Sequence, residues 1–181
     1  MNITVYLGSN LSNSDDLITT VRQLGDYIGK NQHCLIYGGS KSGLMGELAS
    51  HVLDHNGEVI GVEPQFFVDE GYVFDRITKL IVTEDMSSRR LKMIELGDVF
   101  IAMPGGIGTL EELSEVMCKI GLKHLNAPCI IYNLNGYYNP LKDLIKNMYA
   151  LGLTNEDKLN GIYFVENLDE ADKIIKNIKH G

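Results

Sequence analysis

A glycine-rich turn supplies the first residues that could do chemistry. The stretch Pro104–Thr109 reads Pro-Gly-Gly-Ile-Gly-Thr and joins an apolar run to a segment of helical periodicity. Glycines let a backbone approach a ligand closely, and the N-terminus of the following helix offers free N–H groups and a positive dipole end, which together favour phosphate. The alternative is a tight strand-to-helix turn that binds nothing. The spacing matches neither a Walker motif nor a full dinucleotide fingerprint, so ATP and NAD are weakly supported.

Two acidic residues follow this turn directly. Glu111 and Glu112 begin the next helix, beside the expected phosphate site. A carboxylate there can reach the ribose hydroxyls of the same ligand, and glycoside cleavage needs such a group to stabilise an oxocarbenium-like transition state or to orient water. The residues from Thr109 to Glu112 also spell a capping box, in which Glu112 would only bind the backbone N–H of Thr109. Local sequence leaves both interpretations open.

Three cations lie close together before the turn. Arg89, Arg90 and Lys92 fall at the start of a helix expected over Ser87–Leu96, where they oppose the helix dipole unless an anion is nearby. The functional interpretation uses the planar fork of Arg89 to bind ligand and to position Glu112. The alternative is a solvated helix face whose charges pair with neighbouring acidic residues.

An α/β fold must position these groups. Apolar runs of strand length alternate with helical segments along the whole chain, the pattern of repeated βα units around a parallel sheet. We expect strands at Ile3–Leu7, Cys34–Tyr37, Val59–Val62, Leu80–Val82, Val99–Met103, Cys129–Tyr132 and Ile162–Val165. We expect helices at Ser14–Gly29, Leu44–His55, Ser87–Leu96, Leu110–Gly121, Pro140–Ala150 and Leu168–Ile178. Ligands bind beyond the carboxyl ends of such strands, so the glycine loops at Gly8–Asn10, Gly38–Gly43 and Pro104–Thr109 should open on one edge of the sheet.

Length and composition narrow the class of protein. The 181 residues, 44% of them hydrophobic, suit a single domain over residues 1–181. The longest apolar runs fall far short of the roughly 20 residues that span a bilayer, and three widely spaced cysteines suit reduced thiols in the cytoplasm. A net charge of −8 without a basic stripe argues against a nucleic-acid partner. The five histidines show no metal-ligand spacing.

Taken together, the motifs resemble those of the Lonely Guy family of cytokinin riboside 5′-monophosphate phosphoribohydrolases, long labelled lysine decarboxylases. The most specific match is Pro-Gly-Gly-x-Gly-Thr-x-x-Glu, fulfilled by Pro104–Thr109 and Glu112. The second is Met-x-x-Arg-Lys, seen here as Met86, Arg89 and Arg90. The resemblance implies a Rossmann-like, three-layer α/β/α fold with a mostly parallel sheet, no metal or cofactor, and a homodimer or larger homo-oligomer with sites near the subunit interface.

The same resemblance implies roles for individual residues. Arg89 and Glu112 would be the catalytic pair, and the turn from Gly106 to Thr109 would hold a 5′-phosphate. The full substrate-binding set would be Gly8, Ser9, Gly39, Met86, Arg90, Gly105, Gly106, Ile107, Gly108, Thr109, Glu111 and Cys118. Arg90 stands where the family usually has Lys, and Cys118 where Thr is common, so the resemblance does not fix the nucleobase.

Three functions follow as hypotheses. The first is hydrolysis of a nucleoside 5′-monophosphate, AMP or an N6-substituted AMP, to free base and ribose 5-phosphate. The second is a non-catalytic carrier of a phosphorylated ligand, similar to the molybdenum-cofactor carrier proteins, which would be expected to lack the Arg and Glu pair. The third is a decarboxylase, which would need pyridoxal phosphate on a lysine such as Lys41 or Lys92. For the hydrolase, the general acid stays open among Asp69, Glu70, Glu84 and Asp85.

Overall fold

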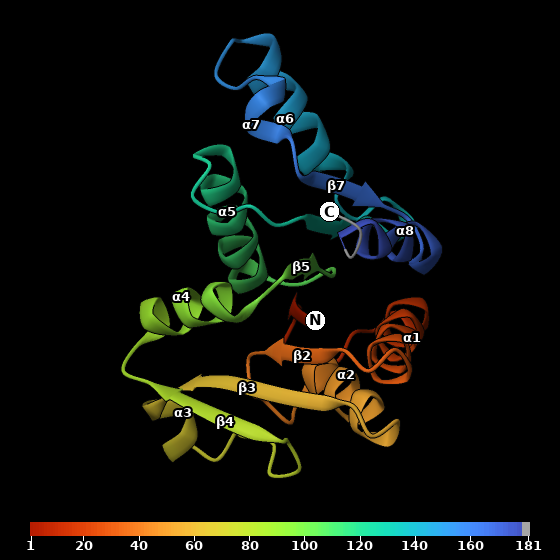
Figure 1. The fold of residues 1–181 in the computed structure, drawn as a ribbon, viewed down its shortest axis with the longest axis vertical. Helices are drawn as coiled ribbons and strands as arrows, with labels where there is room; N and C mark the ends of the chain where they lie inside the picture. The colour runs from red at the N-terminus through yellow and green to blue at the C-terminus, as the bar shows by residue number, and fades with distance from the viewer. Residues whose placement is uncertain (179–181) are drawn as a thin grey trace.

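A seven-stranded parallel sheet forms the centre of the protein in a computed structural model that describes residues 1–178 (Figure 1). The strands are β1 (Asn2–Tyr6), β2 (Cys34–Tyr37), β3 (Glu58–Pro64), β4 (Lys79–Thr83), β5 (Val99–Ala102), β6 (Cys129–Tyr132) and β7 (Ile162–Val165). Their order in the sheet is β4-β3-β2-β1-β5-β6-β7, and every paired strand runs parallel to its neighbour. The predicted α/β fold and all seven predicted strands are confirmed.

The helices follow the strands in alternation. They are α1 (Asp15–Lys30), α2 (Gly43–Asp54), α3 (Gln65–Asp69), α4 (Met86–Leu96), α5 (Ile107–Gly121), α6 (Asn139–Ala150), α7 (Glu156–Leu159) and α8 (Leu168–Ile178), with a 3-10 turn η1 at Leu134–Gly136. All six predicted helices are present. The short α3, α7 and η1 were not predicted, because a segment of one turn shows no helical periodicity. Among residues 1–178, no helix has the length and apolar character that crossing a membrane requires.

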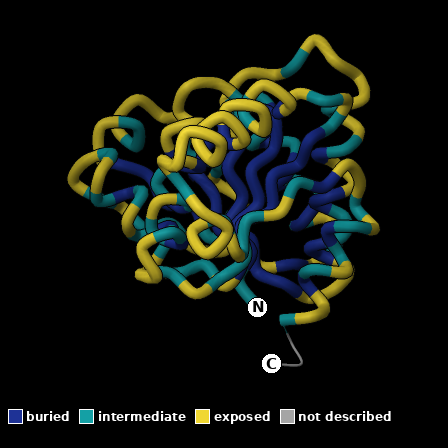
Figure 2. The backbone as a smooth tube through the Cα atoms, turned by 90° about the horizontal axis from the view of Figure 1, so that it is seen from above, coloured by how far each residue is buried: buried dark blue, intermediate teal, exposed yellow. Residues whose placement is uncertain are grey.

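Two apolar cores hold the three layers together. One core lies between the sheet and α1, α2 and α8, and the other between the sheet and α4 and α5. Figure 1 shows α1 and α8 on one side of the sheet and α4 and α5 on the other. The central strands are buried throughout (Figure 2), which explains why they read as continuous apolar runs in the sequence.

The order of the strands reverses between β1 and β5. The chain builds β1 to β4 outward on one side and then returns to place β5 beside β1. The loops that follow these two strands therefore lead to helices on opposite faces, which opens a crevice at their carboxyl ends. Gly8 and Gly105 meet there, since a Cβ added to Gly105 would lie 3.0 Å from the backbone nitrogen of Gly8.

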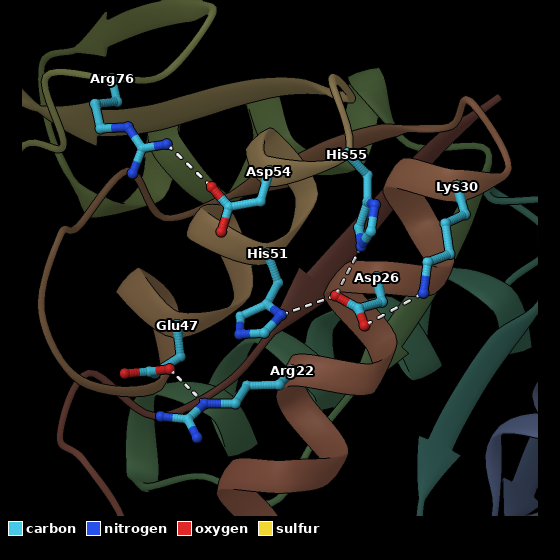
Figure 3. Close-up of polar contacts among 8 residues, drawn as sticks. All are labelled: Arg22, Asp26, Lys30, Glu47, His51, Asp54, His55 and Arg76. Atoms are coloured by element: carbon cyan, nitrogen blue, oxygen red, sulfur yellow. Dashed lines mark hydrogen bonds and ion pairs between the residues drawn. The ribbon is translucent and has the colours of Figure 1, made fainter.

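Helices α1 and α2 pack against each other at glycines. A Cβ added to Gly25 would lie 2.7 Å from Cβ of His51 and 2.8 Å from the carbonyl oxygen of Leu48. Beside this contact, the carboxylate of Asp26 lies 2.8 Å from Nδ1 of His51 and 3.1 Å from Nε2 of His55 (Figure 3). Burial alone would raise the pKa of Asp26, but the hydrogen bonds from both histidines and the nearby lysine charge lower it overall. The polar cluster thus ties together the two helices that the glycines bring close.

We expect Gly25→Ala to destabilise the protein although alanine is the better helix former. Helix propensity favours alanine by about 1 kcal/mol, but the added methyl group forces α1 and α2 apart, so a net loss of roughly 1–3 kcal/mol is expected. Urea unfolding followed by circular dichroism measures the change. Thr19→Ala, on the exposed face of α1, is the matched control and should not destabilise. A Gly25→Ala variant as stable as the wild type would contradict this account of the helix contact.

Candidate functional site

A cavity of about 700 Å³ opens at the carboxyl edge of the sheet. The three glycine loops predicted to meet there all contribute to its wall, and helices α4 and α5 close it from one side. Its lining residues are Val5, Tyr6, Leu7, Gly8, Ser9, Asn10, Gly38, Ser40, Ser42, Met45, Glu63, Phe67, Tyr72, Met86, Arg89, Met93, Gly106, Ile107, Gly108, Thr109, Glu111 and Glu112. Within residues 1–178, no group of three or more metal-ligating side chains is placed to hold an ion.

A buried ion pair lies in the wall of this cavity. Nη1 of Arg89, on α4, donates to Oε1 of Glu112, on α5, at 2.8 Å. Nε of Arg89 donates to the carbonyl oxygen of Val62 at 3.0 Å, which fixes the guanidinium plane. Arg89 is 7% exposed and Glu112 8% exposed. A charge-assisted bond at this depth is only weakly screened by solvent, so it holds both side chains in one geometry.

Glu112 does not cap its own helix. Helix α5 begins after Gly106, and Thr109 lies buried inside its first turn. The capping-box alternative is therefore wrong, because the helix begins three residues earlier than Leu110, where the sequence predicted its start. Burial raises the pKa of Glu112, while the charge and hydrogen bond of Arg89 counteract this rise. The carboxylate is held by a partner on another helix, as expected if Arg89 positions it.

A second carboxyl that sequence analysis missed lies in the same wall. Glu63 is near the end of β3, is 3% exposed, and has Oε2 at 3.9 Å from Nε of Arg89. Burial raises its pKa to about 7, although Arg89 pulls the pKa down. The one signal in the sequence was an acidic residue directly after the apolar run Val59–Val62. By contrast, the four residues suggested as general acid are exposed and line no part of the cavity: Asp69, Glu70, Glu84 and Asp85.

The glycine turn leaves room for a ligand. A Cβ added to Gly106 or to Gly108 would meet nothing within 4 Å, and neither residue has a positive φ. The fold itself therefore does not require glycine at these two positions, whereas a Cβ at Gly105 would overlap the Thr109 hydroxyl. Gly106 is the N-cap of α5 and makes no side-chain cap, so the first N–H groups of the helix remain available to an anion.

Two tyrosines hold this turn from the other side. The hydroxyl of Tyr137 donates to the carbonyl oxygen of Gly105 at 2.5 Å, and that of Tyr138 donates to the carbonyl oxygen of Met103 at 2.8 Å. Both tyrosines come from the segment between η1 and α6, which the sequence analysis left without a role. Their hydrogen bonds fix the backbone before α5 and so fix the direction of its N-terminus.

Most of the predicted site residues line the cavity, but four do not. The predicted residues in the wall are Gly8, Ser9, Met86, Arg89, Gly106, Ile107, Gly108, Thr109, Glu111 and Glu112. Gly39 and Gly105 lie just behind it and give space to Glu63 and Thr109. Arg90 points to α5 instead, with Nη1 3.2 Å from Glu111 and Nε 3.0 Å from Glu115. Cys118 is exposed on α5 outside the cavity, so this chain alone does not bring it to the site.

Among Arg89, Arg90 and Lys92, it is Lys92 that fits the alternative of a solvated charge paired with a neighbouring acidic residue. Lys92 pairs with Glu95 one turn further along α4, at 3.0 Å and in an exposed position. Asp85 accepts a hydrogen bond from the backbone N–H of Ser88 at 2.7 Å and so caps the helix. Neither Lys41 nor Lys92 lines the cavity, nor does any other lysine among residues 1–178. This part of the chain offers no lysine for a pyridoxal phosphate in this cavity.

Comparison with known sequences finds one family over most of the chain. A family model described as possible lysine decarboxylase matches residues 45–176. A cytokinin riboside 5′-monophosphate phosphoribohydrolase of Rhodococcoides fascians is 34% identical over 177 residues, which cover 97% of this chain and 89% of that protein. A protein of the same name from Arabidopsis thaliana is 34% identical over 143 residues, 79% of this chain and 67% of that one.

Solved structures share the fold at lower identity. The molybdenum cofactor carrier protein of Chlamydomonas reinhardtii superposes with a TM-score of 0.76 at 19% identity, covering 99% of this chain and 98% of that chain. The molybdenum cofactor binding protein of Rippkaea orientalis gives 0.72 at 22% identity, over 98% and 96% of the two chains. These likenesses show the fold alone. The sequence matches show more: the chain belongs to the Lonely Guy family of cytokinin riboside 5′-monophosphate phosphoribohydrolases.

Proposed function

We propose that this protein hydrolyses the N-glycosidic bond of a nucleoside 5′-monophosphate, AMP or an N6-substituted AMP, to release the base and ribose 5-phosphate. The observation that carries the proposal is the buried Arg89–Glu112 pair in the wall of a cavity that also contains the N-terminus of α5. A phosphate at that N-terminus places the attached ribose near Glu112, which lies in the second turn of the same helix.

In this proposal Glu112 stabilises the reacting sugar. Departure of the base develops positive charge at C1′, and an ionised carboxylate close to the ribose offsets it or orients the attacking water. Arg89 holds Glu112 through the 2.8 Å bond, and its own plane is fixed by Val62. The chemistry therefore needs both residues in one fixed arrangement, which their burial supports.

A carrier of a phosphorylated ligand is the alternative, because solved carrier proteins share the fold. The likeness of fold carries no information about the ligand. Carriage also gives no reason to bury a cation and two carboxyls beside the binding cavity, since burial of such groups is costly unless their interactions serve a purpose. The buried groups favour catalysis.

The test is an end-point assay of the purified protein with AMP and with a prenylated AMP, in which chromatography detects free base and ribose 5-phosphate. Release of base from either nucleotide supports the hydrolase and ranks the two substrates. Binding of AMP without release from either nucleotide would sink the hydrolase proposal and favour the carrier.

We expect Gly108→Ala to make the protein more stable but to weaken its binding of AMP. Because a Cβ at this helical position meets open space, alanine should stabilise α5 by about 0.5–1 kcal/mol. The same methyl group would occupy space that the proposed phosphate needs, so the KM for AMP should rise about tenfold. Steady-state kinetics and thermal unfolding measure the two effects. Adenosine binding is the control, since a similar loss of affinity for adenosine would show that the turn does not contact phosphate.

A further inference from the structure

Glu63 is a carboxyl in the wall of the cavity. It lies near the carboxyl end of β3 and is buried, yet among the described residues its side chain receives no hydrogen bond from the protein. Its contact with Arg89 is 3.9 Å, longer than the 2.8 Å bond from Arg89 to Glu112. Glu63 lines the cavity and its carboxyl oxygens are not among the fully buried unpartnered atoms of the described residues, so they face the space that a ligand would occupy. A carboxyl placed in this way is a candidate to act on that ligand.

Burial favours the neutral form of Glu63, while the charges around it act in both directions. Arg89 from α4 is the cation that faces it, and Glu112 from α5 shares that cation. From β2, the phenol of Tyr37 lies nearby, and its pKa is raised by burial and by the charge of Glu63. Two carboxyls thus compete for one guanidinium. Glu112 accepts the short hydrogen bond from Arg89, which favours its ionised form, although burial also raises its pKa. Glu63 lies 3.9 Å from the same cation and has a pKa of about 7, so it is the better placed of the two carboxyls to carry a proton near neutral pH.

We propose that Glu63 is the general acid that protonates the departing nucleobase, an inference that rests on the proposed hydrolase function. The C1′–N bond breaks and its electron pair goes to the base, while the proton of the Glu63 carboxyl goes to a ring nitrogen of the base. A water oxygen forms the new bond to C1′ and releases one proton, and solvent returns a proton to Glu63. The net reaction consumes one water. Glu63 and Glu112 would then divide the work of acid and charge stabiliser.

The absence of a side chain at Gly39 leaves the space that the Glu63 side chain occupies. Gly39 has a φ of +83°, and a Cβ there would lie 2.5 Å from Cγ of Glu63. The loop after β2 is thus shaped so that the Glu63 side chain fits beneath it. A purely structural role would be met equally well by glutamine, which has the same shape. Glutamine cannot donate a proton to the base, and this difference makes the two roles separable.

The test compares two leaving groups in the wild type and in Glu63→Gln. AMP needs a proton on its departing base, whereas the nitrophenolate of p-nitrophenyl ribofuranoside 5-phosphate departs without one. Glu63→Gln should lower kcat for AMP about a hundredfold and lower kcat for the nitrophenyl compound less than about tenfold. Equal losses on both substrates, or no loss on AMP, would overturn the role of Glu63 while leaving the hydrolase intact. A wild type inactive on both would instead overturn the hydrolase and this inference with it.

The pH profile of the wild type gives a second test that needs no variant. Loss of the Glu63 proton should make kcat for AMP fall as the pH rises through about 7, with no such fall for the nitrophenyl compound. The same group acts on stability. Folding raises the pKa of Glu63 from 4.5 to about 7. Between these two pH values the folded protein therefore binds more protons than the unfolded chain, and the free energy of unfolding falls as the pH rises. The melting temperature of Glu63→Gln should fall less than that of the wild type over this pH range. Identical pH profiles of kcat on the two substrates would overturn the proposal.

Discussion

Glu112→Gln is expected to lower kcat for AMP hydrolysis about a thousandfold while leaving the fold intact. Glutamine keeps the shape of the side chain and can still accept a hydrogen bond from Arg89 through its amide oxygen. It lacks the negative charge that offsets the positive charge developing at C1′. The loss should therefore fall on kcat, with a much smaller change in the KM for AMP, because the phosphate contacts are untouched.

A matched control comes from the same helix. Glu115 also pairs with an arginine, Arg90, at 3.0 Å, but it lies outside the cavity. Glu115→Gln removes the same charge from α5 and should change kcat less than about threefold, since exposed or partly exposed pairs contribute little. Steady-state kinetics on both variants, with circular dichroism to verify folding, decide the matter. Near-normal turnover by Glu112→Gln would show that the negative charge of Glu112 is not needed for hydrolysis and would contradict the proposed mechanism.

The fold could be predicted closely because its signals are local and repeated. Seven apolar runs alternate with amphipathic helices, and each run is too short for a buried helix. The ends of elements were less predictable. Helix α5 begins at Ile107, since the glycine turn itself enters the first helical turn, and a glycine-rich start weakens the sequence signal for a helix.

Predicting the site needed information that local sequence lacks. Arg89 and Arg90 are neighbours, but successive helical residues point about 100° apart. One therefore enters the cavity and the other reaches Glu115 outside it, and no spacing rule distinguishes them. Glu63 is harder still, because its depth depends on β3 lying beside β2 and on Arg89 crossing from α4. A single acidic residue in a strand reads as a surface residue until those contacts are known.

Arg89→Met should be the most destabilising single change in the site, at a cost of about 3–5 kcal/mol near pH 8. The reason is that the guanidinium is paired with two buried carboxyls. Its removal leaves Glu112 and Glu63 buried together without a cation, and methionine fills much of the volume without replacing the charge. Arg90→Met is the control, because Arg90 pairs with carboxylates nearer the surface and should cost about 1 kcal/mol.

The loss caused by Arg89→Met should depend strongly on pH. Without the cation, the pKa values of both carboxyls rise further in the folded state, while the unfolded chain keeps values near 4.5. The folded variant then binds more protons than the unfolded chain above pH 4.5, so its stability falls as pH rises, and the penalty shrinks toward pH 4.5. Adding Glu63→Gln to Arg89→Met removes one of the two stranded carboxyls and should recover part of the stability at pH 8. Urea unfolding of the single and double variants at pH 5 and pH 8 measures this coupling. If Arg89→Met lowers the free energy of unfolding equally at both pH values, lost packing and not buried charge explains the role of Arg89 in the fold.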